Sequence, residues 1–427
     1  MVSKPRGTRD FDVAEMEKRR FIQKQMETIF KRFAYKEIAT PTLEHLELFE
    51  IKSGENIIDE LYSFKDKGGR DIALRPELTA PVMRFYVEKL QMETKPLKFY
   101  YFGNCFRYDR PQEGRYREFW QMGCELIGSC SPGAIAELIA LAYHAIKKTG
   151  LINIRLRIGN LNLLEKQIRK AIPSSSLSDF SPALHTDIFR LIDKNDIESM
   201  EQLLKKYKSS PKQIALFKEF LQSNNIDDIT NYFKDSTEAQ TDIEDFKKML
   251  DSLELFGVPT RDVIEMNIAR GLDYYTGTVF EIEAPQLGAE KQLCGGGSYT
   301  LVPLLGGTEI PTAGFAIGFD RVMMTLEREN YEFPFSSELI YVMSLDRDLD
   351  REVIKMASQL RYSGFMVDFD LMNRAISRSL KYANKIGAKK TIILGKNEWD
   401  QDKVVIKDMQ SGEQQEVKKE ELEAFLV

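Results

Sequence analysis

The chain has 427 residues, which is long for a single hydrophobic core, so roughly two to four domains are expected. Hydrophobic residues make up 43% of the chain and charged residues 30%, which excludes a disordered or a fibrous protein. The net charge of -6 argues against a protein that coats nucleic acid with its whole surface, although a local basic patch is compatible with it.

Neither a metal site nor a membrane segment is predicted. The chain has three histidines and four scattered cysteines, without a CxxC or a histidine pair at zinc-binding spacing, so we expect no protein-bound metal and thiols in a reducing compartment. The longest apolar run, residues 134–146, contains Glu137 and is too short to cross a bilayer, and the N-terminus has no apolar signal core. We therefore expect a cytoplasmic protein without membrane association.

The first predicted elements are a helix and an extended segment. Residues 12–34 place five apolar side chains near helical spacing among charged residues, which predicts an amphipathic helix: Met16, Phe21, Met26, Ile29 and Phe33. Residues 38–49, IATPTLEHLELF, are predicted to be extended and broken at Pro41, because the residue before a proline is driven out of helical geometry.

The next segment, ALRPELTAPVMRFYVEKL at residues 73–90, predicts a helix with polar residues at its start. Pro81 is tolerated only near a helix start, so Thr79 should be the N-cap, which leaves Glu77 and Thr79 at the mouth of the helix. Simple capping would explain both residues, but capping alone would not need the Arg-Pro-Glu sequence that precedes the helix.

Residues 95–109 and 117–128 are predicted to form an antiparallel hairpin around a short charged loop. Side chains alternate between the two faces of a strand, so each strand places one set on a common face: Gly103, Cys105 and Arg107 on the first, and Gln121, Gly123 and Glu125 on the second. If these faces coincide, they form a polar pocket floored by glycines. The alternative is a solvent-facing strand surface.

The amino-acid composition changes in the middle of the chain. From about residue 163 to 255, dense charge and helical spacing predict a helical insertion between two parts of one sheet domain. The strand pattern then resumes in residues 276–284 and 312–320. Residues 330–337 are interpreted as a linker, and the strand and helix patterns that alternate beyond it predict a small α/β domain with a parallel sheet.

Two glycine-containing segments are candidates for contact with a ligand. In TAGFAIGFDRV, Arg321 falls in the first turn of a predicted helix, where a cation is disfavoured, so either Asp320 or an external phosphate should compensate its charge. In CGGGSY, residues 294–299, the glycines let the backbone pass close to a ligand or another strand. The sequence contains no GxGxxG or GxxxxGK loop, which excludes the common dinucleotide and phosphate loops.

The segment ARGLDYYTGTVFEIEA, residues 269–284, sets a polar cluster in front of a strand pattern. The cluster consists of Arg270, Asp273, Tyr274 and Tyr275. A turn in which the arginine pairs with its own aspartate would account for it.

Taken in order, these segments resemble the class II aminoacyl-tRNA synthetases, and specifically the histidyl-tRNA synthetase family. The first helix and TPTLEHLELF are similar to motif 1 of that class, FRYDRPQEGRYREFWQMGCE to motif 2, and GFAIGFDRV to motif 3. RGLDYYTG resembles a signature of the histidine enzymes, and LRPELT resembles their amino-acid-binding segment. The resemblance covers nearly the whole chain.

The resemblance implies an α+β catalytic domain over residues 1–330, with an antiparallel sheet of the class II synthetase type and a helical insertion at about 163–255. An α/β anticodon-binding domain is implied for residues 331–427. The expected activity is that of a histidine--tRNA ligase, which activates histidine with ATP and transfers it to tRNA(His) in protein biosynthesis. Mg²⁺ with the ATP and a homodimer with motif 1 at its interface are implied too.

The resemblance also assigns roles to individual residues. The arginines expected to be catalytic are Arg270, against the histidine carboxylate and the α-phosphate, Arg107 on the α-phosphate and Arg321 on the γ-phosphate. The ATP phosphates should also contact Arg115. Besides Arg270, the residues expected to bind histidine are Glu77, Thr79 and Gln121 at the α-amino group, Glu125 and Tyr275 at the imidazole, and Tyr274 and Tyr299 in the pocket wall. Arg110 and Gln112 are expected near the acceptor end of tRNA.

Two departures from the family pattern concern the site. Motif 2 here has Asp109, where the family usually carries glutamate. The chain has GSYTLV at residues 297–302, where the family usually carries Gly-Arg-Tyr-Asp-Gly, so we expect a salt bridge of that loop to be lost at Ser298, Thr300 and Leu301.

Four basic residues of the C-terminal domain are predicted to share one face of a helix, which suits a phosphate backbone: Arg374, Arg378, Lys381 and Lys385. Their spacing is i, i+4, i+7 and i+11, and no acidic residue lies between positions 371 and 397. A solvated helix face is the alternative interpretation. The resemblance of this region to an anticodon-binding domain favours tRNA binding.

The main alternative function is that of a non-catalytic, histidine-binding regulatory subunit of ATP phosphoribosyltransferase, which is related to the synthetases. Such subunits typically lack the C-terminal domain and have an eroded RGLDYY segment, and both features are intact here. A synthetase for threonine or proline is opposed by Glu125 and Tyr275. A stand-alone RNA-binding protein would not need an arginine clamp.

Overall fold

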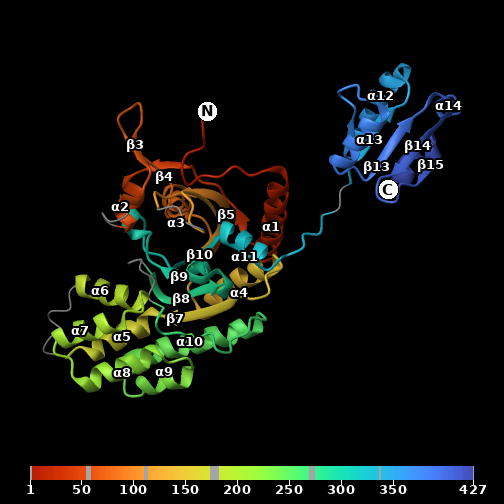
Figure 1. Cartoon of the computed structure of the whole chain (residues 1–427). Helices are drawn as coiled ribbons and strands as arrows, with labels where there is room; N and C mark the ends of the chain where they lie inside the picture. The colour runs from red at the N-terminus through yellow and green to blue at the C-terminus, as the bar shows by residue number, and fades with distance from the viewer. Residues whose placement is uncertain are drawn as a thin grey trace. The chain divides into compact units, whose positions relative to one another are not determined.

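The computed structural model describes residues 2–53, 59–109, 114–173, 182–268, 275–335 and 338–426. The chain divides into two compact units, Met1–Tyr331 and Glu332–Val427 (Figure 1). Each unit is folded around its own sheet and its own hydrophobic core.

A seven-stranded sheet forms the centre of the larger unit, in the order β1-β5-β6-β10-β9-β8-β7. Its strands are β1 (Lys36–Glu37), β5 (Leu97–Phe106), β6 (Glu118–Ile127), β7 (Arg155–Asn160), β8 (Tyr275–Glu283), β9 (Gln292–Tyr299) and β10 (Thr312–Gly318). All neighbours are antiparallel except β1 and β5, so the predicted antiparallel sheet is confirmed apart from its short edge strand. The expected hairpin is the β5–β6 pair.

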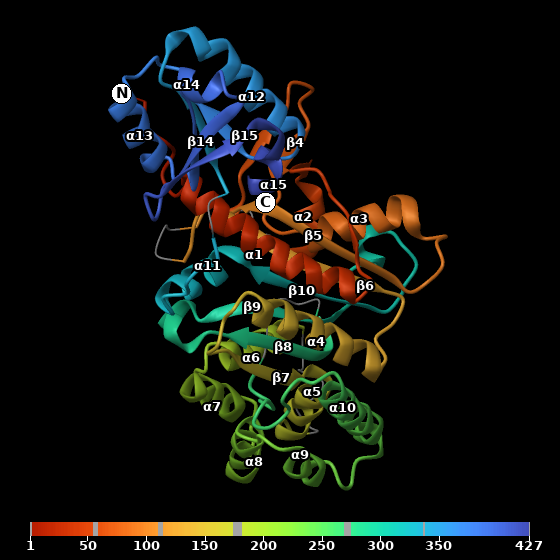
Figure 2. The ribbon, with the colours of Figure 1, turned by 90° about the vertical axis from the view of Figure 1, so that its right-hand side faces the viewer.

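One face of this sheet is covered by long helices, as Figure 2 shows. The helices are α1 (Val13–Arg32), α4 (Pro132–Lys148) and α10 (Thr237–Leu255). The predicted first helix is confirmed, and Asp12 caps it by accepting a hydrogen bond from the backbone N–H of Glu15. Phe30 of α1 packs against Tyr100 of β5 and Phe315 of β10, with ring centroids 5.3 and 5.8 Å apart, which fixes α1 to the sheet.

The opposite face carries short elements around a second buried cluster that includes Leu78, Met83 and Tyr101. These elements are β2 (Leu43–His45), α2 (Glu47–Ser53), β3 (Ser63–Lys65), β4 (Asp71–Leu74), α3 (Thr79–Phe85), the π-helical turn Tyr86–Leu90 and the 3₁₀ turn Pro303–Leu305. The expectation that residues 38–49 are extended is wrong after His45, because burying Leu48 and Phe49 in this cluster favours a helical turn there.

The predicted helical insertion between the sheet strands is confirmed. After β7 the chain forms α5 (Leu161–Ala171), α6 (Pro182–Asp193), α7 (Ile197–Lys206), α8 (Pro211–Leu221) and α9 (Ile226–Tyr232) before α10 returns to the sheet domain. These helices appear yellow to green in Figure 1, and α5 packs against β8. Ser210 and Gln213 form a capping box at the start of α8, as its sequence of Ser-Pro-Lys-Gln favours.

A 3₁₀ turn, Pro285–Glu290, joins β8 to β9, and α11 (Phe319–Arg328) follows β10 directly. The predicted strand, Gly318 and helix are therefore present, with Arg321 in the first helical turn. No helix among the described residues is long and apolar enough to cross a membrane.

The smaller unit has a five-stranded sheet in the order β12-β11-β13-β14-β15. Its elements are β11 (Ile340–Ser344), a 3₁₀ turn (Arg347–Leu349), α12 (Asp350–Tyr362), β12 (Val367–Phe369), α13 (Ile376–Lys385), β13 (Lys390–Leu394), α14 (Lys396–Trp399), β14 (Lys403–Asp408), β15 (Gln414–Lys418), a second 3₁₀ turn (Lys419–Glu421) and α15 (Leu422–Leu426). Only β12, β11 and β13 are parallel. The predicted parallel sheet is confirmed for these three strands, and two strands that the sequence analysis did not predict, β14 and β15, extend it with antiparallel pairing.

Candidate active site

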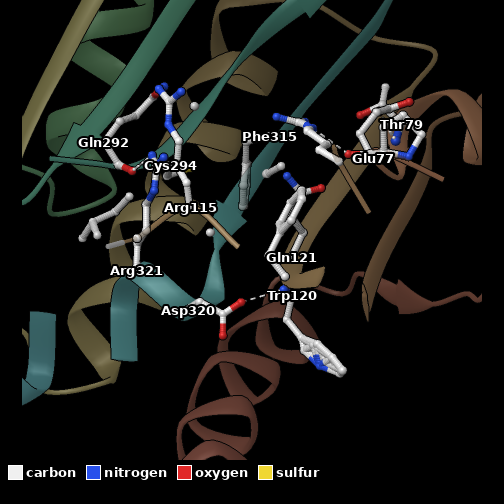
Figure 3. A pocket seen from close by; sticks show the side chains of 18 of the residues that line it. Glu77, Thr79, Arg115, Trp120, Gln121, Gln292, Cys294, Phe315, Asp320 and Arg321 are labelled. Atoms are coloured by element: carbon white, nitrogen blue, oxygen red, sulfur yellow. Dashed lines mark hydrogen bonds between the residues drawn. The ribbon is translucent and has the colours of Figure 1, made fainter. Parts of the chain in front are cut away.

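A cavity of about 470 Å³ opens on the sheet between β5, β6, β9, β10, α3 and the start of α11 (Figure 3). It brings together residues that are up to 261 positions apart in the sequence, from Glu60 to Arg321. Eight of the predicted site residues line it: Glu77, Thr79, Arg107, Arg115, Gln121, Tyr275, Tyr299 and Arg321.

Glu77 lies at the mouth of α3 and caps it. One carboxylate oxygen accepts the backbone N–H of Thr79 at 2.7 Å, and the other accepts that of Ala80 at 3.0 Å. The prediction that Thr79 is the N-cap is wrong by one residue, because Glu77 supplies the capping oxygens and helical geometry already begins at Thr79. A carboxylate has about four acceptor positions, so the two capping bonds by themselves do not prevent Glu77 from receiving a ligand's cation.

The hairpin faces coincide as predicted, since Gly103 pairs with Gln121 and Tyr101 pairs with Gly123 in the β5–β6 register. The expected space above the two glycines is not open, however. The Arg75 guanidinium lies above Gly103, and the Tyr101 hydroxyl lies above Gly123. A Cβ atom on Gly103 would lie 2.6 Å from the Arg75 guanidinium. A Cβ atom on Gly123 would lie 2.3 Å from the carbonyl oxygen of Phe315 and 2.7 Å from the Tyr101 hydroxyl, so the glycines make room for neighbouring side chains and the β10 backbone rather than directly for a ligand.

Glu125 is completely buried beneath the cavity and lies outside its immediate lining. Its carboxyl accepts hydrogen bonds from Tyr101 at 3.1 Å and from Tyr299 at 2.5 Å. Burial raises the pKa of Glu125 from 4.5 to about 8, although the hydrogen bonds from Tyr299, Thr79 and Tyr101 oppose the rise. At neutral pH the ligand-free pocket therefore holds mostly the protonated carboxyl.

Gly314 on β10 is a site residue that the sequence pattern did not reveal. A Cβ atom there would lie 1.9 Å from a carboxyl oxygen of Glu125 and 2.6 Å from the carbonyl oxygen of Cys124. Any other residue at this position would displace the buried carboxyl or the neighbouring strand. On its other side β10 approaches β9 equally closely, which explains Gly296, because its Cβ would lie 2.4 Å from the carbonyl oxygen of Gly314.

Two guanidinium groups of the cavity donate to backbone carbonyls, Arg107 next to Glu77 and Arg321 at the other side. Nε of Arg107 donates to the carbonyl of Pro76 at 3.0 Å, and Nη1 of Arg321 donates to the carbonyl of Gln292 at 2.8 Å. Arg115 is exposed, and Figure 3 shows it beside Arg321 and away from Glu77 and Thr79. A guanidinium has five N–H donors in a planar fork, so a group oriented by one carbonyl is suited to bidentate contact with an anion.

The sequence analysis suggested Asp320 as one of two groups that could compensate the charge of Arg321. In the structure the Asp320 carboxylate is bound by other groups. One of its oxygens binds Arg9 at 2.6 Å and Arg19 at 2.7 Å, and the other accepts the backbone N–H of Trp120 at 2.7 Å. Figure 3 shows the carboxylate directed toward Trp120 and the Arg321 side chain toward Gln292. Sequence reasoning missed Arg9 and Arg19, which have no motif spacing to Asp320.

Of the remaining predicted site residues, the structure describes Tyr275 and leaves four undescribed. Tyr275 lies at the start of β8 and packs edge-on against Tyr299, with ring centroids 6.4 Å apart. Arg270, Tyr274, Arg110 and Gln112 lie outside the described residues.

The two departures from the family pattern are partly explained. Asp109 lines the cavity. Ser298 donates to the carbonyls of Thr276 and Thr278 on β8, and Leu301 is fully buried in the core cluster under α3. The hydrogen bonds of the Ser298 hydroxyl and the burial of Leu301 thus stabilise this segment at two of the three positions where we expected a salt bridge to be lost.

On the smaller unit, the exposed residues Arg378, Lys381 and Lys385 lie on α13. Arg374 precedes the helix, so the prediction of four residues on one helix face is wrong for it. Its Nη1 binds Asp370 at 2.6 Å, and its guanidinium stacks 3.9 Å above the Tyr382 ring. A shallow pocket lies between Arg374 and the first turns of α13. It is lined by Met372, Asn373, Arg374, Ala375, Arg378 and Lys381.

The raised pKa of Glu125 predicts a pH dependence of stability. Between pH 4.5 and about 8, the unfolded chain has lost the Glu125 proton while the folded chain keeps it, so the free energy of unfolding should fall as the pH rises. The Glu125→Gln variant should lack this contribution, which amounts to at most about 1.4 kcal/mol per pH unit. Urea unfolding of both proteins at pH 5, 6, 7 and 8 measures it. Parallel pH profiles would contradict the buried, protonated carboxyl.

The comparisons with known proteins agree with this geometry. The family model described as Histidyl-tRNA synthetase matches residues 7–322, and the model described as Anticodon binding domain matches residues 339–427. The chain is 44% identical to the histidine--tRNA ligase of Archaeoglobus fulgidus, with 100% of this chain and 99% of the relative covered. It is 42% identical to that of Methanocaldococcus jannaschii, with 100% and 99% covered.

Among solved structures, a histidyl-tRNA synthetase from S. aureus in its apo form has the same fold. It is 29% identical and matches with a TM-score of 0.73 over 100% of both chains. The site geometry, the two family models and the full-length relatives lead to one conclusion: this chain belongs to the histidyl-tRNA synthetase family.

Proposed function

We propose that the protein activates histidine with ATP and transfers the histidyl group to the 3′ end of tRNA(His). The observation that carries the proposal is the polarity of one cavity. Glu77 at one end suits the amino group of histidine, the buried Glu125 beneath suits the imidazole, and Arg115 and Arg321 at the other end suit a triphosphate, with Arg107 near Glu77. The carboxylate of bound histidine would then lie between them, beside the α-phosphorus of ATP.

The histidine end offers complementary partners for each polar group of the substrate. Glu77, the Thr79 hydroxyl and the Gln121 amide oxygen are proposed to bind the α-amino group. Glu125 and Tyr275 are proposed to bind the imidazole, while Tyr299 completes the wall and holds Glu125. The protonated form of Glu125 can donate to one ring nitrogen, and its ionised form can accept from a ring N–H. A site built in this way rejects amino acids that lack those groups.

The first reaction step makes histidyl-adenylate. The histidine carboxylate attacks the α-phosphorus, the bond to the β-phosphate breaks, and pyrophosphate leaves. Negative charge grows on the oxygens around phosphorus, so fixed cations lower the barrier. We assign Arg107 to the α-phosphate, Arg321 to the γ-phosphate and Arg115 to the neighbouring phosphates. By resemblance, Arg270 would contact the histidine carboxylate and the α-phosphate.

In the second step, the 3′-hydroxyl of the terminal adenosine attacks the carbonyl carbon of histidyl-adenylate, and AMP leaves. By resemblance, Arg110 and Gln112 would contact the acceptor end of the tRNA. The exposed basic residues of α13, with Arg374 beside them, would contact the phosphate backbone elsewhere on the same tRNA. We therefore assign residues 1–330 to catalysis, with the insertion at about 163–255, and residues 331–427 to anticodon binding.

Mg²⁺ is proposed to enter with ATP. The described residues contain no group of three or more histidine, cysteine, aspartate or glutamate side chains that could hold a metal ion. Phosphate oxygens and water are therefore the proposed ligands of Mg²⁺, whose chemistry would be to offset phosphate charge. A homodimer with the motif 1 segment at its interface and a cytoplasmic location complete the proposal.

The regulatory-subunit alternative has less support. A subunit that only binds histidine has no use for a second unit that matches an anticodon-binding domain over residues 339–427. The triphosphate site that we propose for the guanidinium groups would also have no role in such a subunit.

The proposed reaction is tested by pyrophosphate exchange into ATP across a panel of amino acids. Exchange should depend on histidine. In the Arg321→Met variant, kcat/KM for ATP should fall by about 100-fold, because a transition-state charge loses its fixed partner. The control is Arg328→Met, which removes an exposed arginine of the same helix, and it should behave like the wild type. Histidine binding without exchange would instead favour the regulatory alternative.

The role of α13 has its own test. Replacing Arg378 and Lys381 with glutamate should raise the KM for tRNA at least about tenfold and reduce its salt dependence, because phosphate contacts are lost. Histidine-dependent exchange without tRNA should not change. Lys355→Glu on α12, also exposed in the same unit, is the matched control. Equal tRNA KM values for the double variant and the control would reject this surface.

A further inference from the structure

The N-terminal segment, residues 5–19, reaches two walls of the cavity from outside it. Its first contact is with α11. The guanidinium groups of Arg9 and Arg19 donate to the same oxygen of Asp320, at 2.6 and 2.7 Å. The other Asp320 oxygen accepts the N–H of Trp120, so this one carboxylate joins the segment to the first turn of α11 and to β6.

The second contact is with the chain that leads into β6. The carbonyl of Gly7 accepts the backbone N–H of Arg117 at 2.9 Å. The Arg9 guanidinium also stacks 3.5 Å from the centre of the Tyr116 ring. Tyr116 lines the cavity and directly follows Arg115, so the segment also holds the stretch that carries Arg115.

The contacts of Asp320 with Arg9 and Arg19 are largely shielded from solvent. Asp320 is 4% exposed and Arg19 is 5% exposed, and the Arg19 guanidinium lies against the Phe11 and Phe319 rings at 4.2 and 5.0 Å. A buried carboxylate needs its charge balanced and its oxygens bonded. Arg9 and Arg19 meet that need at one Asp320 oxygen and the Trp120 N–H meets it at the other, whereas the neighbouring Arg321 side chain is directed toward Gln292.

We propose that Arg9 is a positioning residue for the nucleotide. Through Asp320 it fixes the helical turn that carries Arg321, and through Tyr116 it fixes the stretch that carries Arg115. It therefore sets the separation of the two guanidinium groups that would clamp a triphosphate, without touching the nucleotide itself. This inference rests on the proposed function, because it takes ATP as the ligand of Arg115 and Arg321.

The test compares Arg9→Met, Arg9→Lys and Arg20→Met in histidine-dependent pyrophosphate exchange with the full-length protein. Arg20 is an exposed residue of α1 whose guanidinium bonds Gln23 of the same helix, so Arg20→Met is the matched control. Arg9→Met should raise the KM for ATP about tenfold while the KM for histidine stays within about twofold. Arg9→Lys keeps the charge beside Asp320 but loses the planar stack on Tyr116, so it should recover part of the ATP affinity.

Thermal unfolding of the same variants separates positioning from general damage. Arg9 lies near the surface, with 23% of its side chain exposed, so Arg9→Met should keep a Tm close to that of Arg20→Met. An ATP KM equal to that of the control, or ATP and histidine KM values that rise together with a lower Tm, would overturn the inference while leaving the proposed function intact. If the wild type shows no histidine-dependent exchange, both fail.

Discussion

Carboxyl groups and guanidinium groups lie in or directly beneath one cavity in this protein, and the proposed chemistry depends on where the fold holds each of them. The carboxyl groups are engaged by donors from the fold. Glu77 accepts two backbone N–H groups at the start of α3, and Glu125 is buried under two tyrosine hydroxyls with a pKa raised to about 8. Asp320 is bound by Arg9 and Arg19, which come from the N-terminus.

The arginines of the cavity are held in a matching way. Arg107 and Arg321 donate to the carbonyls of Pro76 and Gln292, which orient a guanidinium but carry only a partial negative charge. In the proposed function, a triphosphate would meet oriented guanidinium groups here, which would reduce the reorganisation that accompanies the growth of charge in the transition state. The sheet supplies the rigidity, because β6, β9 and β10 form its centre.

Local patterns predicted much of this architecture. The strand parity of the β5–β6 hairpin placed Arg107 and Gln121 correctly, and the Gly318-to-helix pattern placed Arg321 in the first turn of α11. Contacts between distant residues could not be found in this way. Arg9 and Asp320 are 311 positions apart and share no periodicity, and the requirement for glycine at Gly314 appears only once Glu125 is seen beneath it. The antiparallel return of β15 likewise depends on pairing that strand patterns do not encode.

The most direct test of the separation of charges is a crystal structure of the protein with a non-hydrolysable sulfamoyl analogue of histidyl-adenylate. The account predicts that the imidazole lies within hydrogen-bonding distance of Glu125, the α-amino group lies at Glu77, and the sulfamoyl group faces Arg107. An analogue bound in the reverse direction, or bound outside this cavity, would contradict the account.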